Sequence, residues 1–170
     1  MTKVGAANPV VLIDGRSGAG KTSLAQRIVA GWPQRGRVQS VALDSLYPGW
    51  DGLAEGVAYA RSTILVPHAR GMVGVWERWD WTAAERAEAH AVDPSLPLIV
   101  EGSGLLTPET ALLGDVRVWV ESPVQSRRRR GLARDGETYV PHWDGWAAQE
   151  DAHLERDEPA RHATLVIAVP

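Results

Sequence analysis

A glycine-rich segment at residues 15–22 constrains this chain more than any other part of its sequence. The segment is Gly15-Arg16-Ser17-Gly18-Ala19-Gly20-Lys21-Thr22, which fits the pattern G-x-x-x-x-G-K-T. The apolar run Val10–Ile13 precedes it and an amphipathic stretch begins at Lys21, so the pattern lies between an expected strand and an expected helix. This context is typical of a loop that binds phosphate groups through its backbone.

The residue types of this loop indicate its chemistry. Glycines allow the chain to curl with its N–H groups turned inward, at the positive end of the following helix. Lys21 supplies a positive charge for the terminal phosphates, and the Thr22 hydroxyl supplies an oxygen ligand for Mg²⁺. We therefore expect ATP and Mg²⁺ to bind here; the alternative is a glycine-rich turn that matches the pattern by chance. The expected nucleotide contacts are Gly15, Ser17, Gly18, Ala19, Gly20, Lys21, Thr22 and Ser23.

Apolar strands and helical segments alternate along the chain. Four further apolar runs predict strands at 38–43, 96–100, 116–120 and 163–169. Helical spacing follows Lys21 and recurs over 53–64, where the second helix is expected to end before Pro67. Residues 68–81 are irregular and are interpreted as a loop or short strands. The pattern predicts an α/β fold, the P-loop NTPase three-layer sandwich, with a mostly parallel five-stranded sheet and helices on both faces.

Length and composition fit one domain over residues 1–170 and exclude several classes of protein. Of the 170 residues, 44% are hydrophobic and 23% are charged, which is ordinary for a globular protein. There is no apolar stretch of about 18 residues, and Met1–Ala7 has no hydrophobic signal region, so we expect a cytoplasmic protein without a membrane partner. The net charge of -3 argues against a nucleic-acid partner, and the absence of cysteine excludes disulfides.

Two acidic residues follow predicted strands at the edge of the sheet where ligands bind. Asp44 follows the second strand and is our candidate general base for an acceptor hydroxyl; it could also hold a Mg²⁺-bound water. Its alternative role is to cap the next turn. Glu101 ends the third strand as a candidate Mg²⁺ ligand beside Thr22, and the alternative is a surface charge at a strand end.

A basic cluster follows the fourth strand. On a helix, Arg127, Arg130 and Arg134 lie at i, i+3 and i+7 and so share one face. Three guanidinium groups on one face suit a lid, over approximately residues 126–158, that neutralises charge on a transferred phosphoryl group. The alternative is a solvated helix face or a nonspecific polyanion patch.

With these residues placed, the chain resembles the uridine kinase and phosphoribulokinase branch of the P-loop nucleoside and small-molecule kinases. Asp44-Ser45-Leu46-Tyr47 is similar to the Asp-Ser-Phe-Tyr of that family, whose Asp is the base, and Glu101-Gly102 is similar to its Glu-Gly-Ile, whose Glu helps to hold Mg²⁺. Arg127, Arg130 and Arg134-Asp135 are similar to its Arg-rich lid. The resemblance implies transfer of the γ-phosphoryl group of ATP to a hydroxyl of a small molecule, most simply a nucleoside.

The acceptor side departs from that family. Trp79-Asp80-Trp81 falls where uridine kinases have Tyr-Asp-Phe, which implies aromatic stacking on a planar acceptor; the alternative is that the tryptophans fill the core. The Asp-His-Pro signature after the second strand is absent, and Pro48–Gly52 stands there instead. The expected acceptor contacts are Tyr47, Trp50, Asp51, Trp79, Asp80 and Trp81.

Motifs that are absent from the sequence help to distinguish this chain from other classes of nucleotide-binding protein. The chain has no N-K-x-D motif and no D-x-x-G motif, so a regulatory GTPase is excluded. Two alternatives stay open: a nucleotide-binding module that regulates or hydrolyses ATP slowly without an acceptor, and a kinase of an antibiotic or other secondary metabolite.

Overall fold

A five-stranded parallel sheet forms the centre of the protein. The computed structural model describes residues 8–33 and 37–170, so Met1–Ala7 and the side chain of Asp135, which entered the sequence analysis, lie outside the described part. The strand order is β2-β5-β1-β6-β7, and each pair of neighbours in this order is parallel. The strands are β1 (Val10–Asp14), β2 (Gln39–Ala42), β5 (Leu98–Glu101), β6 (Val116–Glu121) and β7 (Leu165–Ala168). This arrangement confirms the predicted fold class.

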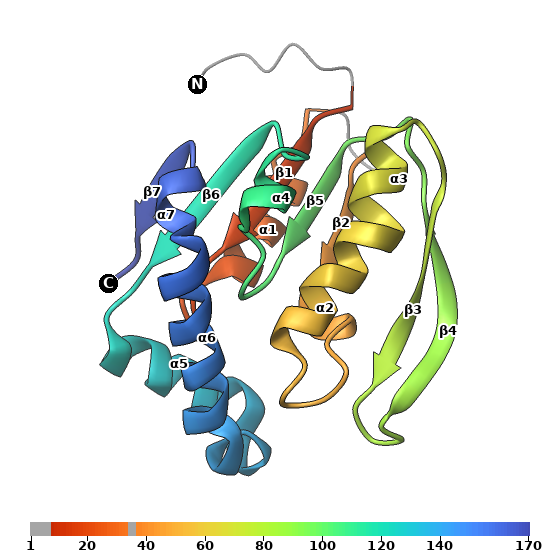
Figure 1. Ribbon diagram of the computed structural model, residues 1–170. Helices are drawn as coiled ribbons and strands as arrows, with labels where there is room; N and C mark the ends of the chain where they lie inside the picture. Colours follow the sequence, from red (N-terminus) through yellow and green to blue (C-terminus); the bar gives the residue numbers. More distant parts are fainter. Residues whose placement is uncertain (1–7, 34–36) are drawn as a thin grey trace.

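Helices cover both faces of the sheet, as Figure 1 shows. Alternate residues of β1 point to opposite faces of the sheet. Val11 and Ile13 pack in a cluster with Ala25 of α1 (Lys21–Ala30), whereas Leu12 packs in a second cluster with Leu53, the first residue of the next helix. The second cluster lies under α2 (Leu53–Ala60) and the long helix α6 (Trp143–Asp157). Further helices of the described residues include α4 (Pro108–Ala111), α5 (Val124–Asp135) and α7 (Pro159–His162). Within residues 8–33 and 37–170, no helix has the length and apolar character that crossing a membrane requires.

The second helix does not end before Pro67, so that prediction is wrong. It continues through one wide π-helical turn, Arg61–Leu65, into α3 (Val66–Ala69). The N–H of Val66 donates to the carbonyl of Arg61, five residues back. Proline lacks an N–H and ordinarily clashes with the preceding helical turn, and the wide turn directly before Pro67 relieves that conflict.

A two-stranded hairpin occupies residues 74–92, where only a loop or short strands were expected up to residue 81. Strand β3 (Gly74–Asp80) pairs with β4 (Glu85–Val92) in antiparallel register beside α2 and α3 (Figure 1). The turn is held by the Asp80 carboxylate, which accepts the N–H groups of Thr82 and Ala83, each at 2.9 Å. Most of β4 is exposed, so it lacks the apolar run that signals a strand.

Gly56 lies where α2 meets the segment after β2. A Cβ atom at this position would lie 2.5 Å from Cδ1 of Tyr47 and 3.0 Å from its Cα. Tyr47 is buried and its hydroxyl donates to the carbonyl of Ser103 at 2.7 Å, so the ring has little room to move. Gly145 offers a contrast, because a Cβ there in α6 would meet no heavy atom within 4 Å.

We predict opposite effects for the same substitution at these two helical glycines. Gly145→Ala should raise the free energy of unfolding by up to about 1 kcal/mol, because alanine restricts the unfolded chain and favours the helix. Gly56→Ala should lower it by roughly 1–3 kcal/mol, because the methyl group overpacks against Tyr47. Urea denaturation of both variants measures the difference, and stabilisation by Gly56→Ala would contradict the packing argument.

Candidate functional site

The glycine-rich loop connects β1 to α1 and adopts the backbone geometry that an anion-binding loop needs. Gly20 precedes the first residue of α1 with φ +105°, a conformation that residues with a side chain rarely adopt. Gly18 has φ +76°, and a Cβ atom on it would lie 2.1 Å from the carbonyl oxygen of Arg127. The glycines are therefore required both by the turn and by the close approach of α5 to the loop.

Lys21 and Thr22 lie at the N-terminus of α1, next to the acid that ends β5. The hydroxyl of Thr22 donates to Oε1 of Glu101 at 2.8 Å. Nζ of Lys21 donates to the carbonyl of Arg16 and to Oγ of Ser103, each at 3.2 Å. A hydroxyl and a carboxylate oxygen side by side match the oxygen ligands that Mg²⁺ prefers. The donor set of Thr22 and Glu101 therefore fits this metal.

A cavity of about 350 Å³ opens in front of the loop. It brings the basic and acidic residues singled out in the sequence to one place, because β1, β2 and β5 end at the same edge of the sheet. Within it, NH2 of Arg134 lies 3.9 Å from Oδ2 of Asp44. The cavity is lined by Ser17, Gly18, Lys21, Thr22, Asp44, Tyr47, Trp50, Trp81, Glu101, Ser103, Arg134, Thr138, Tyr139 and Trp146.

Aromatic side chains form one wall of the cavity, here called the aromatic wall, which contains Trp50, Trp81, Tyr139 and Trp146. The ring of Trp50 lies 4.9 Å from that of Trp81 and is stacked on Tyr139 at 5.4 Å. Nε1 of Trp81 donates to the carbonyl of Asp44 at 2.8 Å, so the hairpin holds the backbone of the acid. Trp50 and Trp81, predicted as acceptor contacts, therefore lie in the same cavity as Asp44.

Two of the three predicted lid arginines point elsewhere. NH1 of Arg127 donates to the carbonyl of Ser17 at 3.3 Å, and Nε of Arg130 donates to the carbonyl of Gly18 at 2.8 Å. Neither lines the 350 Å³ cavity, whereas Arg134 does. Arg127 and Arg130 thus join α5 to the glycine-rich loop.

Three predicted acceptor contacts also lie outside the residues that line this cavity: Asp51, Trp79 and Asp80. Asp80 holds the hairpin turn, as described above, and Arg78 lies beside it with a distance of 3.4 Å between NH2 and Oδ2. The ring of Trp79 lies 5.7 Å from the guanidinium of Arg86 on the neighbouring strand. The contacts described here for Trp79 and Asp80 are those of the hairpin itself.

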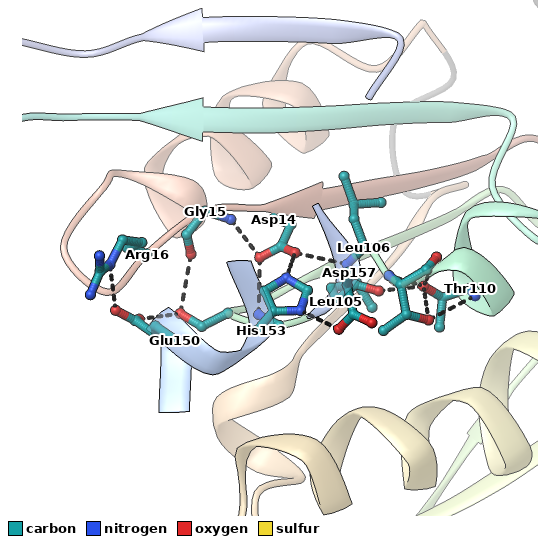
Figure 2. A network of polar contacts seen from close by, with 12 residues as sticks. Asp14, Gly15, Arg16, Leu105, Leu106, Thr110, Glu150, His153 and Asp157 are labelled. Carbon is teal, nitrogen blue, oxygen red and sulfur yellow. Dashed lines mark hydrogen bonds and ion pairs between the residues drawn. The ribbon is translucent and has the colours of Figure 1, made fainter. Parts of the chain in front are cut away.

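The sequence analysis missed a buried polar network behind the loop, which Figure 2 shows. Asp14, the last residue of β1, is fully buried and accepts the N–H groups of Gly15, Gly104 and Leu106 at 2.6, 3.0 and 2.7 Å. Its Oδ2 also lies 3.0 Å from Nε2 of His153 on α6. An acid that ends a strand directly before Gly15 was a signal of the same kind as Asp44 and Glu101.

His153 bridges two carboxylates. Nδ1 lies 2.8 Å from Oδ2 of Asp157, and Nε2 faces Asp14, so the imidazolium form donates in both directions. Burial lowers the pKa of His153, but the hydrogen bonds and charges of Asp14 and Asp157 outweigh it, and the pKa lies above its ordinary value. The spacing of His153 and Asp157 at i and i+4 on one helix could have indicated this pair.

A second cavity, of about 600 Å³, lies at the carboxyl ends of β6 and β7. Arg16 of the loop and Arg127 of α5 border it, and Cγ1 of Val169 lies 4.0 Å from the place that a Cβ atom on Gly20 would take. This cavity therefore adjoins the glycine-rich loop on the side away from Asp44. The sequence analysis assigned no role to these residues beyond the loop itself and Arg127.

Burial makes the ionised form of the Glu101 carboxyl less favourable. This side chain is 5% exposed, and burial raises its pKa above the ordinary value, while the charge of Lys21 and the hydrogen bond from Thr22 lower it less than burial raises it. An ionised Glu101 is therefore destabilising until a cation compensates it.

Solved structures of kinases share this fold. A scan of protein-family models and a search of curated proteins found no match. A possible uridine kinase from Bacillus stearothermophilus is similar, with a TM-score of 0.71 and 20% identity, over 98% of this chain and 91% of that chain. A candidate fructose transport system kinase from Silicibacter sp. TM1040 has a TM-score of 0.59 at 16% identity, over 98% and 92%. A gluconokinase from Sinorhizobium meliloti 1021 has a TM-score of 0.52 at 17% identity, over 96% and 82%.

The raised pKa of Glu101 predicts a trade-off between stability and metal binding. The folded state holds this proton more tightly than the unfolded state, so a penalty to folding develops as pH rises from about 4.5 through the raised pKa. Glu101→Gln should therefore increase the free energy of unfolding at pH 7 without ligand, and the gain should disappear at pH 4. The same variant should weaken Mg²⁺-dependent nucleotide binding. Urea denaturation measures the free energy of unfolding, and calorimetry measures nucleotide binding. A loss of stability at pH 7 in Glu101→Gln would contradict the raised pKa of Glu101.

The His153 bridge predicts a pH dependence of the same sign, but in a higher pH range. Its raised pKa contributes stability that is fully present below about pH 6.5 and is lost as pH rises through the folded pKa. The free energy of unfolding should therefore decrease above pH 6.5, and His153→Gln should flatten that decrease. Direct NMR titration of the imidazole provides a measurement that does not depend on the stability of the variant. An ordinary or lowered pKa would disprove the bridge.

Proposed function

We propose that this protein is a Mg²⁺-dependent kinase that transfers the γ-phosphoryl group of ATP to a hydroxyl of a small molecule. The observation that carries the proposal is the cavity itself, which holds Lys21, the pair of Thr22 and Glu101, and the carboxylate of Asp44. Phosphoryl transfer needs a phosphate cradle, a metal ligand and a proton acceptor at one place. The similarity in fold to solved kinases supports this class of reaction.

On the donor side, the loop amides would bind the phosphates and Lys21 would contact the terminal ones. The cavity of about 600 Å³ at the ends of β6 and β7 is our candidate site for the nucleotide base, because it adjoins the loop away from Asp44. Thr22 and Glu101 would hold Mg²⁺, which supplies neutralisation of phosphate charge when it is bound.

On the acceptor side, Asp44 would take the proton of the attacking hydroxyl. The hydroxyl oxygen then forms a bond to the γ-phosphorus as the bond from that phosphorus to the ADP oxygen breaks. The side chain of Asp44 is 61% exposed, so a substrate can reach it. Arg134, 3.9 Å away, would stabilise the charge of the transferred group.

The aromatic wall supports a planar, nucleoside-like acceptor. Trp50, Trp81 and Trp146 line the same cavity as Asp44, and Trp81, which is 39% exposed, is the ring most open to a planar ligand. The fold similarity to a possible uridine kinase is consistent with this class, and the resemblance of Asp44–Tyr47 to the family motif supports it. We further propose that the chain forms one catalytic domain and that residues 126–158 cover the site as a lid, in which Arg134 reaches Asp44 while Glu150 and His153 stay fixed against Ser17 and Asp14.

The proposal is tested by ADP release from ATP in Mg²⁺ buffer with a panel of nucleosides, sugars and aromatic alcohols. Release that depends on one acceptor class, together with a phosphorylated product detected by mass spectrometry, supports a kinase and identifies its substrate. Slow release that is equal for all additions supports an ATPase or regulatory module instead.

Asp44→Asn should lower the rate of transfer by about 100-fold or more, because the amide cannot accept the hydroxyl proton. Nucleotide affinity should stay within about twofold, because no phosphate contact is removed. Glu55→Gln on α2 is a matched control, since this exposed acid does not line the cavity. Transfer near the parent rate in Asp44→Asn would show that another group, or none, accepts the proton.

A further inference from the structure

A buried carboxylate behind the phosphate-binding loop has no part in the reaction proposed above. Glu150 lies on α6 with a side chain that is 3% exposed, as seen at the left of the network in Figure 2. Its Oε1 accepts the N–H of Ser17 at 2.6 Å, and its Oε2 accepts Nε–H of Arg16 at 3.1 Å. A carboxylate is stable in such a place only when donors replace the water that it loses. The loop and Glu150 therefore hold each other in place.

Ser103 connects this carboxylate to Lys21. The hydroxyl oxygen of Ser103 lies 3.2 Å from Nζ of Lys21, 3.0 Å from Oε1 of Glu150 and 3.1 Å from the carbonyl oxygen of Gly15. An ammonium group only donates, so Ser103 accepts from Lys21 and directs its single proton to one of the two oxygens. An ionised carboxylate is a stronger acceptor than a carbonyl. The hydrogen bonds therefore run from Lys21 through Ser103 to Glu150.

The second hydrogen bond described for Lys21 also depends on this carboxylate. Nζ donates to the carbonyl of Arg16, whose side chain and following N–H are both held by Glu150. Both of these acceptors for the ammonium are thus fixed by one buried charge. We propose that Glu150, through Ser103, is a positioning residue that sets where the Lys21 ammonium meets the terminal phosphates.

The neighbouring residue on α6 extends the alignment to the acceptor side. Gln149 donates through Nε2 to the carbonyl of Trp50 at 2.8 Å and accepts the N–H of Leu53 at 3.1 Å. One turn of α6 therefore contacts the donor loop through Glu150 and the segment after Asp44 through Gln149. The same helix therefore positions Lys21 on the donor side and Trp50 on the acceptor side, so α6 sets the distance between them.

Ser103→Ala tests the connection without disturbing the contacts of Glu150 with Ser17 and Arg16. The inference rests on the proposed function, because it assigns Lys21 to the terminal phosphates. Calorimetry with Mg²⁺–ATP and Mg²⁺–ADP should show about tenfold weaker binding of ATP, the loss expected for one hydrogen bond to a charged group, and a change within about twofold for ADP. Glu150→Gln should shift the ratio of the two affinities in the same direction.

Asp151→Asn is the matched control. Asp151 is the other carboxylate on Arg16, with Oδ1 at 2.7 Å from NH1, but it is 61% exposed and has no described contact with Ser103. Its substitution should leave the ratio of ATP to ADP affinity unchanged. The double variant Ser103→Ala with Glu150→Gln should lose no more than Glu150→Gln alone, because the two residues act in series.

Three results would overturn the inference. They are an unchanged ATP to ADP ratio in folded Ser103→Ala, an equal shift in Asp151→Asn, or additive losses in the double variant. Folding is checked by circular dichroism, and Glu150→Gln gives a second measurement if Ser103→Ala does not fold. Failure of the parent protein to bind either nucleotide would instead refute the proposed function, on which this inference rests.

Discussion

The fully buried carboxylate of Asp14 is the interaction on which the site depends most. It ends β1 and accepts three backbone N–H groups, from Gly15 at the start of the phosphate-binding loop and from Gly104 and Leu106 after β5. His153 supplies the compensating positive charge from α6. Because an uncompensated charge in the interior is very unfavourable, β1, the loop after β5 and α6 must assemble together around it.

This arrangement separates the back of the loop from its front. Behind it, Asp14, Glu150 and the arginines of α5 contact the loop through its backbone and hold its shape. In front, Lys21 and the pair of Thr22 and Glu101 face the cavity. A site prepared in this way does not have to reorganise when phosphate charge arrives, which is the condition under which fixed groups contribute most to catalysis.

The same helix that holds the donor loop also supports the acceptor side. Gln149 on α6 contacts the backbone of Trp50, whose ring stacks in the aromatic wall, and Trp81 of the hairpin binds the carbonyl of Asp44. The hairpin β3–β4 therefore contributes to the site although few of its residues line the cavity. In the proposed kinase, donor and acceptor would be aligned by elements far apart in sequence, which suits a reaction that depends on positioning.

The sequence by itself determined the parallel sheet, the loop between β1 and α1, and the acids at the ends of β2 and β5, because apolar runs, glycine spacing and strand ends are local signals. It did not determine that the helix continues past Pro67, because the π-helical turn Arg61–Leu65 that accommodates the proline has no local sequence signal. It did not determine β4 either, because the exposed residues of this strand lack an apolar pattern. Only the tertiary structure decided that Arg127 and Arg130 face the loop while Arg134 faces Asp44. It also decided that Glu150 contacts Ser17, 133 positions away in the sequence, and that His153 contacts Asp14, 139 positions away. Contacts of this kind arise from how helices pack on the sheet, and no periodicity along the chain records them.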